Sequence, residues 1–457
     1  MNPVDLKTLS DWCDGALIQG RPSDLVGGIS TDSRSSTASD LFVALKGDRF
    51  DAHDFLDQVV SSEVAGILIS ALPKETESFS GGVILVRDTL KALQDVARAY
   101  RKSCQNLTVV GVTGSNGKTS TKDFLGAVLS RAGKVNKTAG NLNNHIGVPL
   151  TALSTESGTR YGVWEMGMNH SGEIEVLAEI AAPDAAVVTH IGTAHIEHMK
   201  TRDAIAEEKS QLPRAVPSSG YCVMPATDDY FSYVADSVAC EMIPVGGDDG
   251  LVRAVDPRVL PDGKSSFQLV SEFSSSLEVQ LSVRGEHMIQ NALLAAAVGF
   301  KEGLSSEQIA EALAESRLTS GRLEEKVVEG IGFLDDSYNA NPDSMKAAIR
   351  TLESADVSGK RVAVLGFMGE LGEIEGEAHR EVGAFLVQSG IDVLVTTGDR
   401  ARQIEDGADG ISSAKNFESH AETAEYLKGI LEAGDLVLVK GSRAADMGKV
   451  LELIESA

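Results

Sequence analysis

Residues 107–120, LTVVGVTGSNGKTS, join a mainly apolar segment to a glycine-rich turn that ends in Lys118 and Thr119. The apolar segment predicts a buried strand of a parallel sheet. Apolar positions between Phe124 and Leu129 predict a helix directly after the turn. In such a unit, backbone N–H groups surround phosphate oxygens at the positive end of the helix dipole. Lys118 would neutralise β and γ phosphates there, and the Thr119 hydroxyl would bind Mg²⁺.

The turn is shorter than the strict phosphate-loop pattern, because Val112 stands six residues before Lys118 where that pattern has glycine. A glycine turn followed by a chance Lys-Thr pair is the alternative. The strand and helix on either side of the turn favour a phosphate loop. We therefore predict an ATP-binding loop formed by Gly114, Ser115, Asn116, Gly117, Lys118, Thr119 and Ser120.

Strands and helices are expected to alternate around this unit, which predicts an α/β protein. Further strands of the same sheet are expected at residues 161–164, 185–189 and 220–224, whereas the period-two alternation of residues 266–283 predicts an antiparallel hairpin at the sheet edge. A later series of strands resembles a doubly wound, Rossmann-like domain. That series has no GxGxxG motif at its start, so a nicotinamide cofactor is not indicated.

The length of 457 residues is enough for about three domains. Changes in pattern place the boundaries near Gln105 and near Ser320. The prediction is a small α/β domain, a central P-loop ATPase-like domain with a parallel sheet, and a C-terminal Rossmann-like domain, at residues 1–104, 105–318 and 319–457.

Charge and cysteine content narrow the range of partners. The chain has 67 Asp and Glu against 41 Lys and Arg, a net charge of −26, which argues against general affinity for nucleic acid or an anionic membrane. The four cysteines are far apart and form no CxxC pair, as expected for reduced thiols in a cytosolic protein. Neither a signal peptide nor an apolar run of about 20 residues is apparent. We therefore expect a cytoplasmic protein without nucleic-acid or stable membrane association.

Polar residues follow the strands after the glycine-rich turn. Glu165 ends the next strand, where a second Mg²⁺ ligand is needed because the crevice of such a sheet lies at its carboxyl edge. A solvated carboxylate is the alternative. His190, His195 and His198 follow another strand and would permit a zinc site, but no cysteine is near, and we predict His195 as the metal-binding residue. Lys209 lies on an expected helix and by itself indicates only an exposed lysine.

Several longer motifs carry a resemblance. TDSR at 31–34, LFVALKG at 41–47 and FDAHDF at 50–55 lie in the first predicted domain. The other motifs are NLNNHIGVP at 141–149, EMGMNHSGEI at 165–174, DDSYNANPDS at 335–344, MGELG at 368–372 and KGSR at 440–443. Over nearly the whole chain, these segments resemble the Mur ligase family of ATP-dependent amide-forming enzymes of peptidoglycan synthesis.

The resemblance is strongest to the branch that adds D-alanyl-D-alanine. It implies that the chain joins this dipeptide to UDP-N-acetylmuramoyl-tripeptide through an acyl phosphate, giving the UDP-MurNAc-pentapeptide, ADP and phosphate. One alternative is a MurE-type ligase that adds a single amino acid, although its DNPR-like motif is absent. Another is a folylpolyglutamate synthetase, which the DSR motif of the first domain disfavours. A P-loop protein that binds nucleotide without ligation is the third.

The resemblance also implies roles for individual residues. Thr119 and Glu165 would hold one Mg²⁺, and His195 with Glu165 would help to hold a second. Lys209 matches a family lysine that CO₂ can carboxylate, and its carbamate would act at the second metal. Because Lys118 and Arg322 lie in different domains, closure about a hinge near residues 318–320 must assemble the site.

Lys118, Glu165, His195, Lys209 and Arg322 form the predicted catalytic set. The resemblance assigns Asn291, Arg322 and Asp336 to the adenine, the γ-phosphate and the ribose of ATP. The predicted substrate-binding residues are Ser30, Asp32, Ser33, Arg34, Asn143, Asn144, Tyr338 and Asn339. We expect the chain to act as a monomer.

Overall fold

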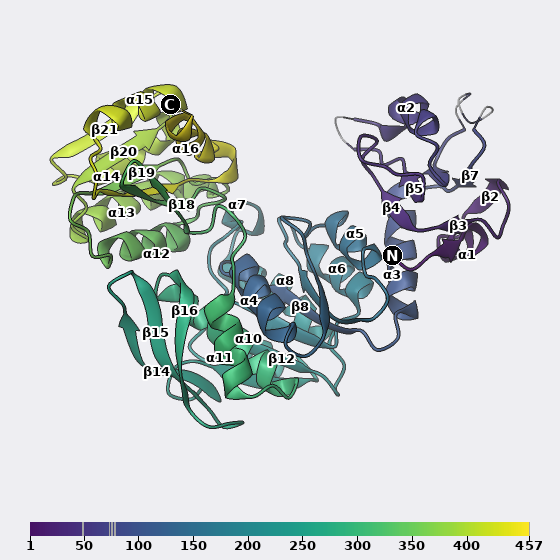
Figure 1. Cartoon of the computed structure of the whole chain (residues 1–457), viewed down its shortest axis with the longest axis horizontal. Coiled ribbons are helices and arrows are strands. Elements are labelled where there is room, and N and C mark those ends of the chain that lie inside the picture. Colours follow the sequence, from purple (N-terminus) through teal and green to yellow (C-terminus); the bar gives the residue numbers. More distant parts are fainter. Residues whose placement is uncertain (48–49, 73, 75, 77–78, 457) are drawn as a thin grey trace.

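The computed structural model describes residues 1–47, 50–72, 74, 76 and 79–456. Within these residues, three α/β units follow one another along the chain, and the N-terminal and C-terminal sheets lie on opposite sides of Figure 1 with the central unit between them. The α/β fold class expected from the sequence is confirmed. None of the described helices is long and apolar enough to cross a membrane.

The N-terminal unit contains a sheet in the order β2-β7-β6-β5-β4, parallel except for β2. Its strands are β2 (Ala16–Gln19), β4 (Gly28–Ser30), β5 (Asp40–Val43), β6 (Gly66–Ile69) and β7 (Gly82–Leu85), and β1 (Val4–Asp5) pairs with β3 (Leu25–Val26). Its helices are α1 (Leu6–Trp12), η1 (Ala52–Phe55) and α2 (Leu56–Ser61). Helix α3 (Thr89–Ser103), capped by Asp88, then packs against α5 (Gly147–Leu153) and α6 (Glu173–Ala181) of the central unit.

The central sheet has the order β16-β15-β14-β13-β12-β11-β8-β10-β9 among the described residues. Its strands are β8 (Thr108–Thr113), β9 (Lys134–Lys137), β10 (Thr159–Glu165), β11 (Ala185–Val188), β12 (Tyr221–Pro225), β13 (Glu241–Val245), β14 (Val252–Val259), β15 (Lys264–Ser271) and β16 (Leu277–Arg284). The strands from β9 to β14 are parallel, whereas β15 and β16 are antiparallel additions at one end. The hairpin predicted at residues 266–283 is therefore present.

Helices cover both faces of this sheet. They are α4 (Lys118–Leu129), α5 (Gly147–Leu153), α6 (Glu173–Ala181), α7 (Ile196–Met199), α8 (Arg202–Arg214), α9 (Phe231–Asp236), α10 (His287–Lys301) and α11 (Ser306–Glu315). Strand side chains alternate between the two faces: Val110 and Val112 pack in the core with α4 and α10, while Val109 packs in the core with α6 and α8. This double cover explains why β8 is almost wholly apolar.

The C-terminal sheet has the order β17-β18-β22-β19-β20-β21 and is parallel except for β17. Its strands are β17 (Glu324–Val328), β18 (Ile331–Asp336), β19 (Arg361–Leu365), β20 (Val393–Thr397), β21 (Ser413–Phe417) and β22 (Leu436–Lys440). Its helices are α12 (Pro342–Glu353), η3 (Gly372–Ile374), α13 (Glu375–Gln388), η4 (Asp399–Ala401), α14 (Arg402–Gly407), α15 (His420–Ile430), η5 (Arg443–Ala445) and α16 (Gly448–Glu455).

Strands at sheet edges had no clear sequence pattern. β9, β17 and β21 each form the outer strand of a sheet and carry polar residues on partly exposed positions. Such strands need apolar residues on fewer positions than a central strand.

The domain boundaries stay predictions, but the segment between α11 and β17 is where the chain passes from the central to the C-terminal sheet.

Candidate active site

The glycine-rich turn lies between the end of β8 and the start of α4. Gly114 and Gly117 have φ angles of 150° and 77°. A Cβ atom on Gly114 would lie 1.9 Å from Thr189 Oγ1, and one on Gly117 would lie 2.4 Å from Asn291 Oδ1. Both glycines are therefore required by backbone conformation and by close packing. The turn has the form expected of a phosphate loop, because it leads into the N-terminus of α4, where the first N–H groups of a helix can bind phosphate oxygens.

Two lysines donate to one carbonyl oxygen of this loop. Lys118 Nζ lies 2.7 Å from Gly114 O, and Lys209 Nζ on α8 lies 3.0 Å from the same atom. Burial lowers the pKa of Lys118, and it lowers the pKa of Lys209 far more, with the charge of Lys118 adding to the effect. Lys209 is only 1% exposed. It is thus not the exposed lysine that the sequence alone would indicate, but a buried amine next to the phosphate loop.

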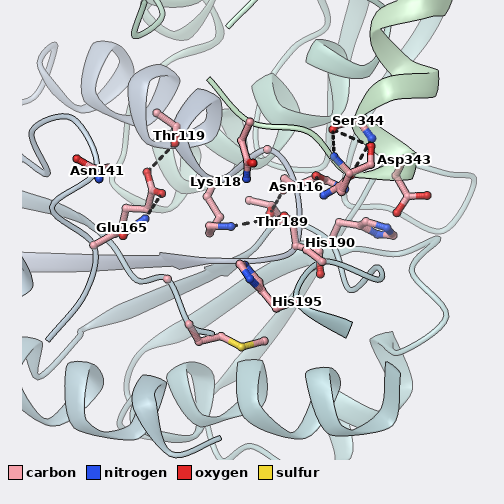
Figure 2. Close-up of a pocket in the computed structure, with 18 of the residues that line it drawn as sticks. Asn116, Lys118, Thr119, Asn141, Glu165, Thr189, His190, His195, Asp343 and Ser344 are labelled. Atoms are coloured by element: carbon pink, nitrogen blue, oxygen red, sulfur yellow. Dashed lines mark hydrogen bonds between the residues drawn. The ribbon is translucent and has the colours of Figure 1, made fainter. Parts of the chain in front are cut away.

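Glu165, at the end of β10, faces the first turn of α4. Its Oε2 atom accepts a hydrogen bond of 2.9 Å from Thr119 Oγ1, as Figure 2 shows. Its Oε1 atom accepts one of 2.8 Å from the Asn143 amide. Lys122 Nζ lies 4.0 Å from the same carboxylate, which is 2% exposed. A buried carboxylate beside a hydroxyl supplies the oxygen donors that Mg²⁺ prefers.

His195 lies at the start of α7 with a φ angle of 64°. Its Nδ1 atom lies 2.5 Å from Oε2 of Glu370, which belongs to the C-terminal unit. This is a close ion-pair contact without hydrogen-bond geometry, because Nδ1 has no hydrogen-bond partner among the described residues. Burial lowers the pKa of the His195 imidazole, and the charges of Lys118 and Lys209 act in the same direction. In Figure 2 the ring lies beside Lys118 and at a distance from Glu165.

The three clustered histidines do not converge on one point. His190 Nδ1 contacts Asp228 Oδ2 at 2.9 Å, His195 contacts Glu370, and the His198 ring packs on His170 with centroids 4.7 Å apart. Within the described part of the chain, no group of three His, Cys, Asp or Glu side chains is arranged to hold a metal. The zinc alternative therefore has no ligand set among these residues.

The C-terminal unit completes the cleft. The Arg322 guanidinium lies over the Tyr338 ring at 4.4 Å, and its buried Nε has no hydrogen-bond partner among the residues that the structure describes. Lys440 Nζ contacts Asp336 Oδ2 at 2.5 Å. Asn341 Nδ2 donates to Asn116 Oδ1 of the phosphate loop at 2.7 Å. This buried, unsatisfied N–H group of a cation in the cleft wall is suited to an anionic ligand.

A cleft of about 1340 Å³ lies between the central and C-terminal units. Its size fits a nucleotide together with peptide groups. Most of the predicted site residues line it: Ser115, Asn116, Gly117, Lys118, Thr119, Ser120, Asn143, Asn144, Glu165, His195, Asn291, Arg322, Asp336, Tyr338 and Asn339. Gly114 and Lys209 lie behind its wall, joined by the hydrogen bond described above.

The predicted residues of the N-terminal unit form a separate group after β4. Arg34 makes two hydrogen bonds to the Asp32 carboxylate, at 2.9 and 2.7 Å, and lowers the pKa of Asp32 to about 2. The hydroxyl of Ser30 donates to Asp32 O at 3.2 Å, and that of Ser33 donates to the Gln58 side chain. None of these four residues lines the cleft. Their assignment to UDP-substrate binding stays a prediction.

Sequence reasoning assigned no role to two carboxylates at this site. Asp228 follows β12 and holds the His190 ring, and Glu370 follows β19 and holds His195. Both come shortly after the carboxyl end of a parallel strand, which is the signal that identified Glu165. The same rule applied to every strand would have found them.

Comparison with known proteins gives a consistent result. Residues 112–299 match the Mur ligase middle domain, and residues 321–443 match the Mur ligase glutamate ligase domain. The chain is 36% identical to the UDP-N-acetylmuramoyl-tripeptide–D-alanyl-D-alanine ligase of Bacillus subtilis (strain 168), covering 99% of this chain and 98% of that one.

Two solved structures are similar over nearly the full chain. One is MurF from Acinetobacter baumannii, with a TM-score of 0.91 and 32% identity, covering 100% of this chain and 99% of that one. The other is MurF ligase from Thermotoga maritima in complex with ADP, with a TM-score of 0.83 and 30% identity, covering 94% and 97%.

Proposed function

Since this chain belongs to the Mur ligase family, we propose that it is an ATP-dependent ligase that joins D-alanyl-D-alanine to UDP-N-acetylmuramoyl-tripeptide. The product would be the UDP-MurNAc-pentapeptide precursor of peptidoglycan. The observation that carries the proposal is the cleft itself, where a phosphate loop and Glu165 of the central unit face Arg322 of the C-terminal unit. The full-length similarity to ligases with this name supports the choice of substrates.

ATP is the nucleotide that fits the reaction. The Thermotoga maritima relative holds ADP, the expected product of ATP in such a ligation. In this chain the phosphate loop would bind the phosphates, and Asn291, which packs on Gly117, would face the adenine. Asp336 would contact the ribose from the C-terminal unit. We assign the γ-phosphate to Lys118 and to Arg322, whose Nε has no hydrogen-bond partner within the described part of the chain.

The donor set also fits Mg²⁺. Thr119 Oγ1 and Glu165 Oε2 are hard oxygen donors 2.9 Å apart, and phosphate oxygens and water would supply the remaining ligands. His195, with Glu165, would serve a second ion. When bound, these ions offset negative charge on the phosphates. Lys209 fits the carbamate role, because burial lowers the pKa of its amine strongly and so favours the neutral form, which is the form that reacts with CO₂.

The reaction must activate a carboxylate, because oxide is not a leaving group. The terminal carboxylate of the tripeptide attacks the γ-phosphorus of ATP, the bond to the β–γ bridging oxygen breaks, and ADP leaves with that electron pair. The dipeptide ammonium group loses a proton to solvent, and the free amine attacks the carbonyl carbon of the acyl phosphate. The tetrahedral intermediate then expels inorganic phosphate and leaves an amide. Lys118 and Arg322 reduce the repulsion between the two anions that meet in the first step.

The three units would divide this work. We propose that residues 1–104 bind the UDP group through Ser30, Asp32, Ser33 and Arg34, that residues 105–318 bind ATP, and that residues 319–457 close over it. Asn143, Asn144, Tyr338 and Asn339 would contact the peptide substrates in the cleft. We propose that the chain acts as a monomer in the cytoplasm, where ATP and UDP-linked precursors are available.

A two-substrate phosphate-release assay tests the proposal. Release should require both UDP-N-acetylmuramoyl-tripeptide and D-alanyl-D-alanine, and the product mass should equal their sum minus water. Single amino acids with the UDP-dipeptide serve as the comparison, because a MurE-type ligase would act on that pair. Hydrolysis of ATP that no amine stimulates would instead indicate a nucleotide-binding protein without ligase activity.

A further inference from the structure

Glu370 and His195 form a contact between two structural units. Glu370 follows β19 in the C-terminal unit, and its Oε2 atom lies 2.5 Å from Nδ1 of His195 in the central unit. A backbone hydrogen bond from Glu197 N to Glu370 O, 3.2 Å long, lies directly beside this contact. The 3₁₀ helix η3 packs against α7 at the same place. Glu370 therefore reaches His195 along a docked interface and not from a free loop end.

Both residues are held in uncommon backbone conformations. Glu370 has a φ angle of 60°, and His195 has one of 64°, which non-glycine residues adopt rarely because of steric cost. The next glycine, Gly372, lies against Glu197, and a Cβ atom there would approach the Glu197 side chain to 3.3 Å. The interface thus fixes the directions of both side chains at an energetic cost.

The contact leaves one ring nitrogen of His195 for another partner. With Nδ1 facing a carboxylate, only Nε2 can supply a lone pair to a cation. Metal-binding histidines commonly give their other ring N–H to a carboxylate, which fixes the tautomer and the ring orientation.

We propose that Glu370 is a positioning residue that orients the His195 ring for metal binding, so that the docked C-terminal unit completes the metal site of the central unit. This inference rests on the Mg²⁺ role of His195 in the proposed function. It couples two events, because undocking of the C-terminal unit withdraws Glu370 and frees the ring to rotate. Nucleotide-bound metal and domain docking would then stabilise each other.

The test measures binding without turnover. The Kd of a non-hydrolysable ATP analogue is measured by calorimetry across a Mg²⁺ titration for wild type, Glu370→Ala and Glu370→Gln. The alanine variant should need about 10- to 100-fold more Mg²⁺ for half of the effect on Kd, and its Kd without Mg²⁺ should be unchanged. The glutamine variant keeps a polar side chain of the same shape at this contact and should recover part of the loss.

Two controls separate positioning from simple loss of structure. Glu373 is exposed, lies three residues away, and takes part in none of the ion pairs of the described residues, so Glu373→Ala should behave as wild type. In a His195→Ala background, Glu370→Ala should add no further shift, because the ring it orients is absent. An additive shift in the double variant would overturn the proposal, as would an unchanged Mg²⁺ dependence in Glu370→Ala.

This experiment is independent of the ligation chemistry. If phosphate release did not depend on the dipeptide while analogue binding still depended on Mg²⁺, the proposed function would be rejected. The Mg²⁺ titration would then still decide the role of Glu370. If analogue binding by the wild type did not depend on Mg²⁺, the positioning role would be rejected, whatever the ligase assay gave.

Discussion

Asp123 Oδ2 accepts two hydrogen bonds from Thr319, one of 2.7 Å from the backbone N–H and one of 2.8 Å from the hydroxyl. The two residues are 196 positions apart, and Asp123 lies one turn into α4, the helix that follows the phosphate loop. Its Oδ1 atom lies 2.8 Å from Lys137 Nζ. The phosphate-loop helix therefore holds the segment that leads into the C-terminal unit, three residues before Arg322.

Thr319→Val should loosen this attachment. The substitution keeps the shape and the backbone N–H but removes the hydroxyl donor, and a hydrogen bond to a charged group contributes about 1.5–3 kcal/mol. We expect the free energy of unfolding to fall by about 1–2 kcal/mol in urea titrations. Turnover should fall more than substrate affinity, because Arg322 must be placed for the phosphoryl transfer.

Thr319→Ser is the matched control, since it retains the hydroxyl. It should keep both stability and kcat near wild type. Equal stability and kcat for the valine and serine variants would show that the hydroxyl contact has no part in placing Arg322.

Lys118→Ala should remove turnover but not the N-terminal binding site. Loss of one charge-stabilising group commonly lowers kcat by about 10²–10³-fold. The predicted UDP-binding residues lie outside the cleft that contains Lys118. Calorimetry should therefore show UDP-substrate binding near the wild-type Kd. Loss of that binding together with turnover would point to misfolding and not to a phosphate-binding role for this lysine.

The local part of this site could be predicted from the sequence. A strand, a glycine turn and a helix that are adjacent in the chain remain adjacent in space, so Lys118 and Thr119 could be placed without knowing the rest of the fold. Glu165 followed from the rule that ligands meet the carboxyl edge of parallel strands. Asn143 was predicted only as a substrate-binding residue. In the structure its side-chain amide donates a hydrogen bond to Glu165.

Contacts between units could not be predicted in the same way. The pairs His195–Glu370, Asn116–Asn341 and Asp123–Thr319 depend on how the C-terminal unit docks. The residue pattern around these positions does not indicate how the units dock. The burial of Lys209 was also hidden, because one helical lysine among glutamates has the same pattern whether it faces solvent or a phosphate loop.

Lys209→Ala should lower activity, and added small carboxylates should partly restore it. The buried amine next to Gly114 O would carry a carbamate, and formate or acetate could occupy the space left by the shortened side chain. Activity should fall at least about 10²-fold and recover measurably with added carboxylate. Lys200→Ala, at an exposed lysine, is the control, and its activity should equal that of wild type with or without added carboxylate. An unmodified Lys209 mass together with no rescue would contradict the carbamate role.

Gly117→Ala should weaken nucleotide binding. Its φ angle of 77° is strained for alanine, and the added Cβ would lie 2.4 Å from Asn291 Oδ1. The loop or Asn291 must shift, and both face the nucleotide in the proposed function. We expect the Kd for ATP to rise by about 10-fold or more, since strain of this kind costs about 1–3 kcal/mol. Gly158→Ala has a similar φ of 76°, with open space around it, and controls for backbone strain alone. Equal ATP affinity in the two variants would reject the contact with Asn291 as the cause.

His287 should make stability depend on pH. Burial lowers the pKa of its imidazole to about 4, well below the value of 6.5 expected in the unfolded chain. Between these values the unfolded chain binds more protons, so stability rises with pH across this window and falls as pH decreases through it. The fall attributable to His287 should be about 2 kcal/mol between about pH 7 and about pH 4.5. His287→Asn should lack this pH-dependent part of the stability. Urea unfolding of both proteins is measured across pH, and the difference between their free energies of unfolding separates the contribution of His287 from that of the many carboxylates. A constant difference at every pH would mean that His287 titrates alike in the folded and unfolded chains.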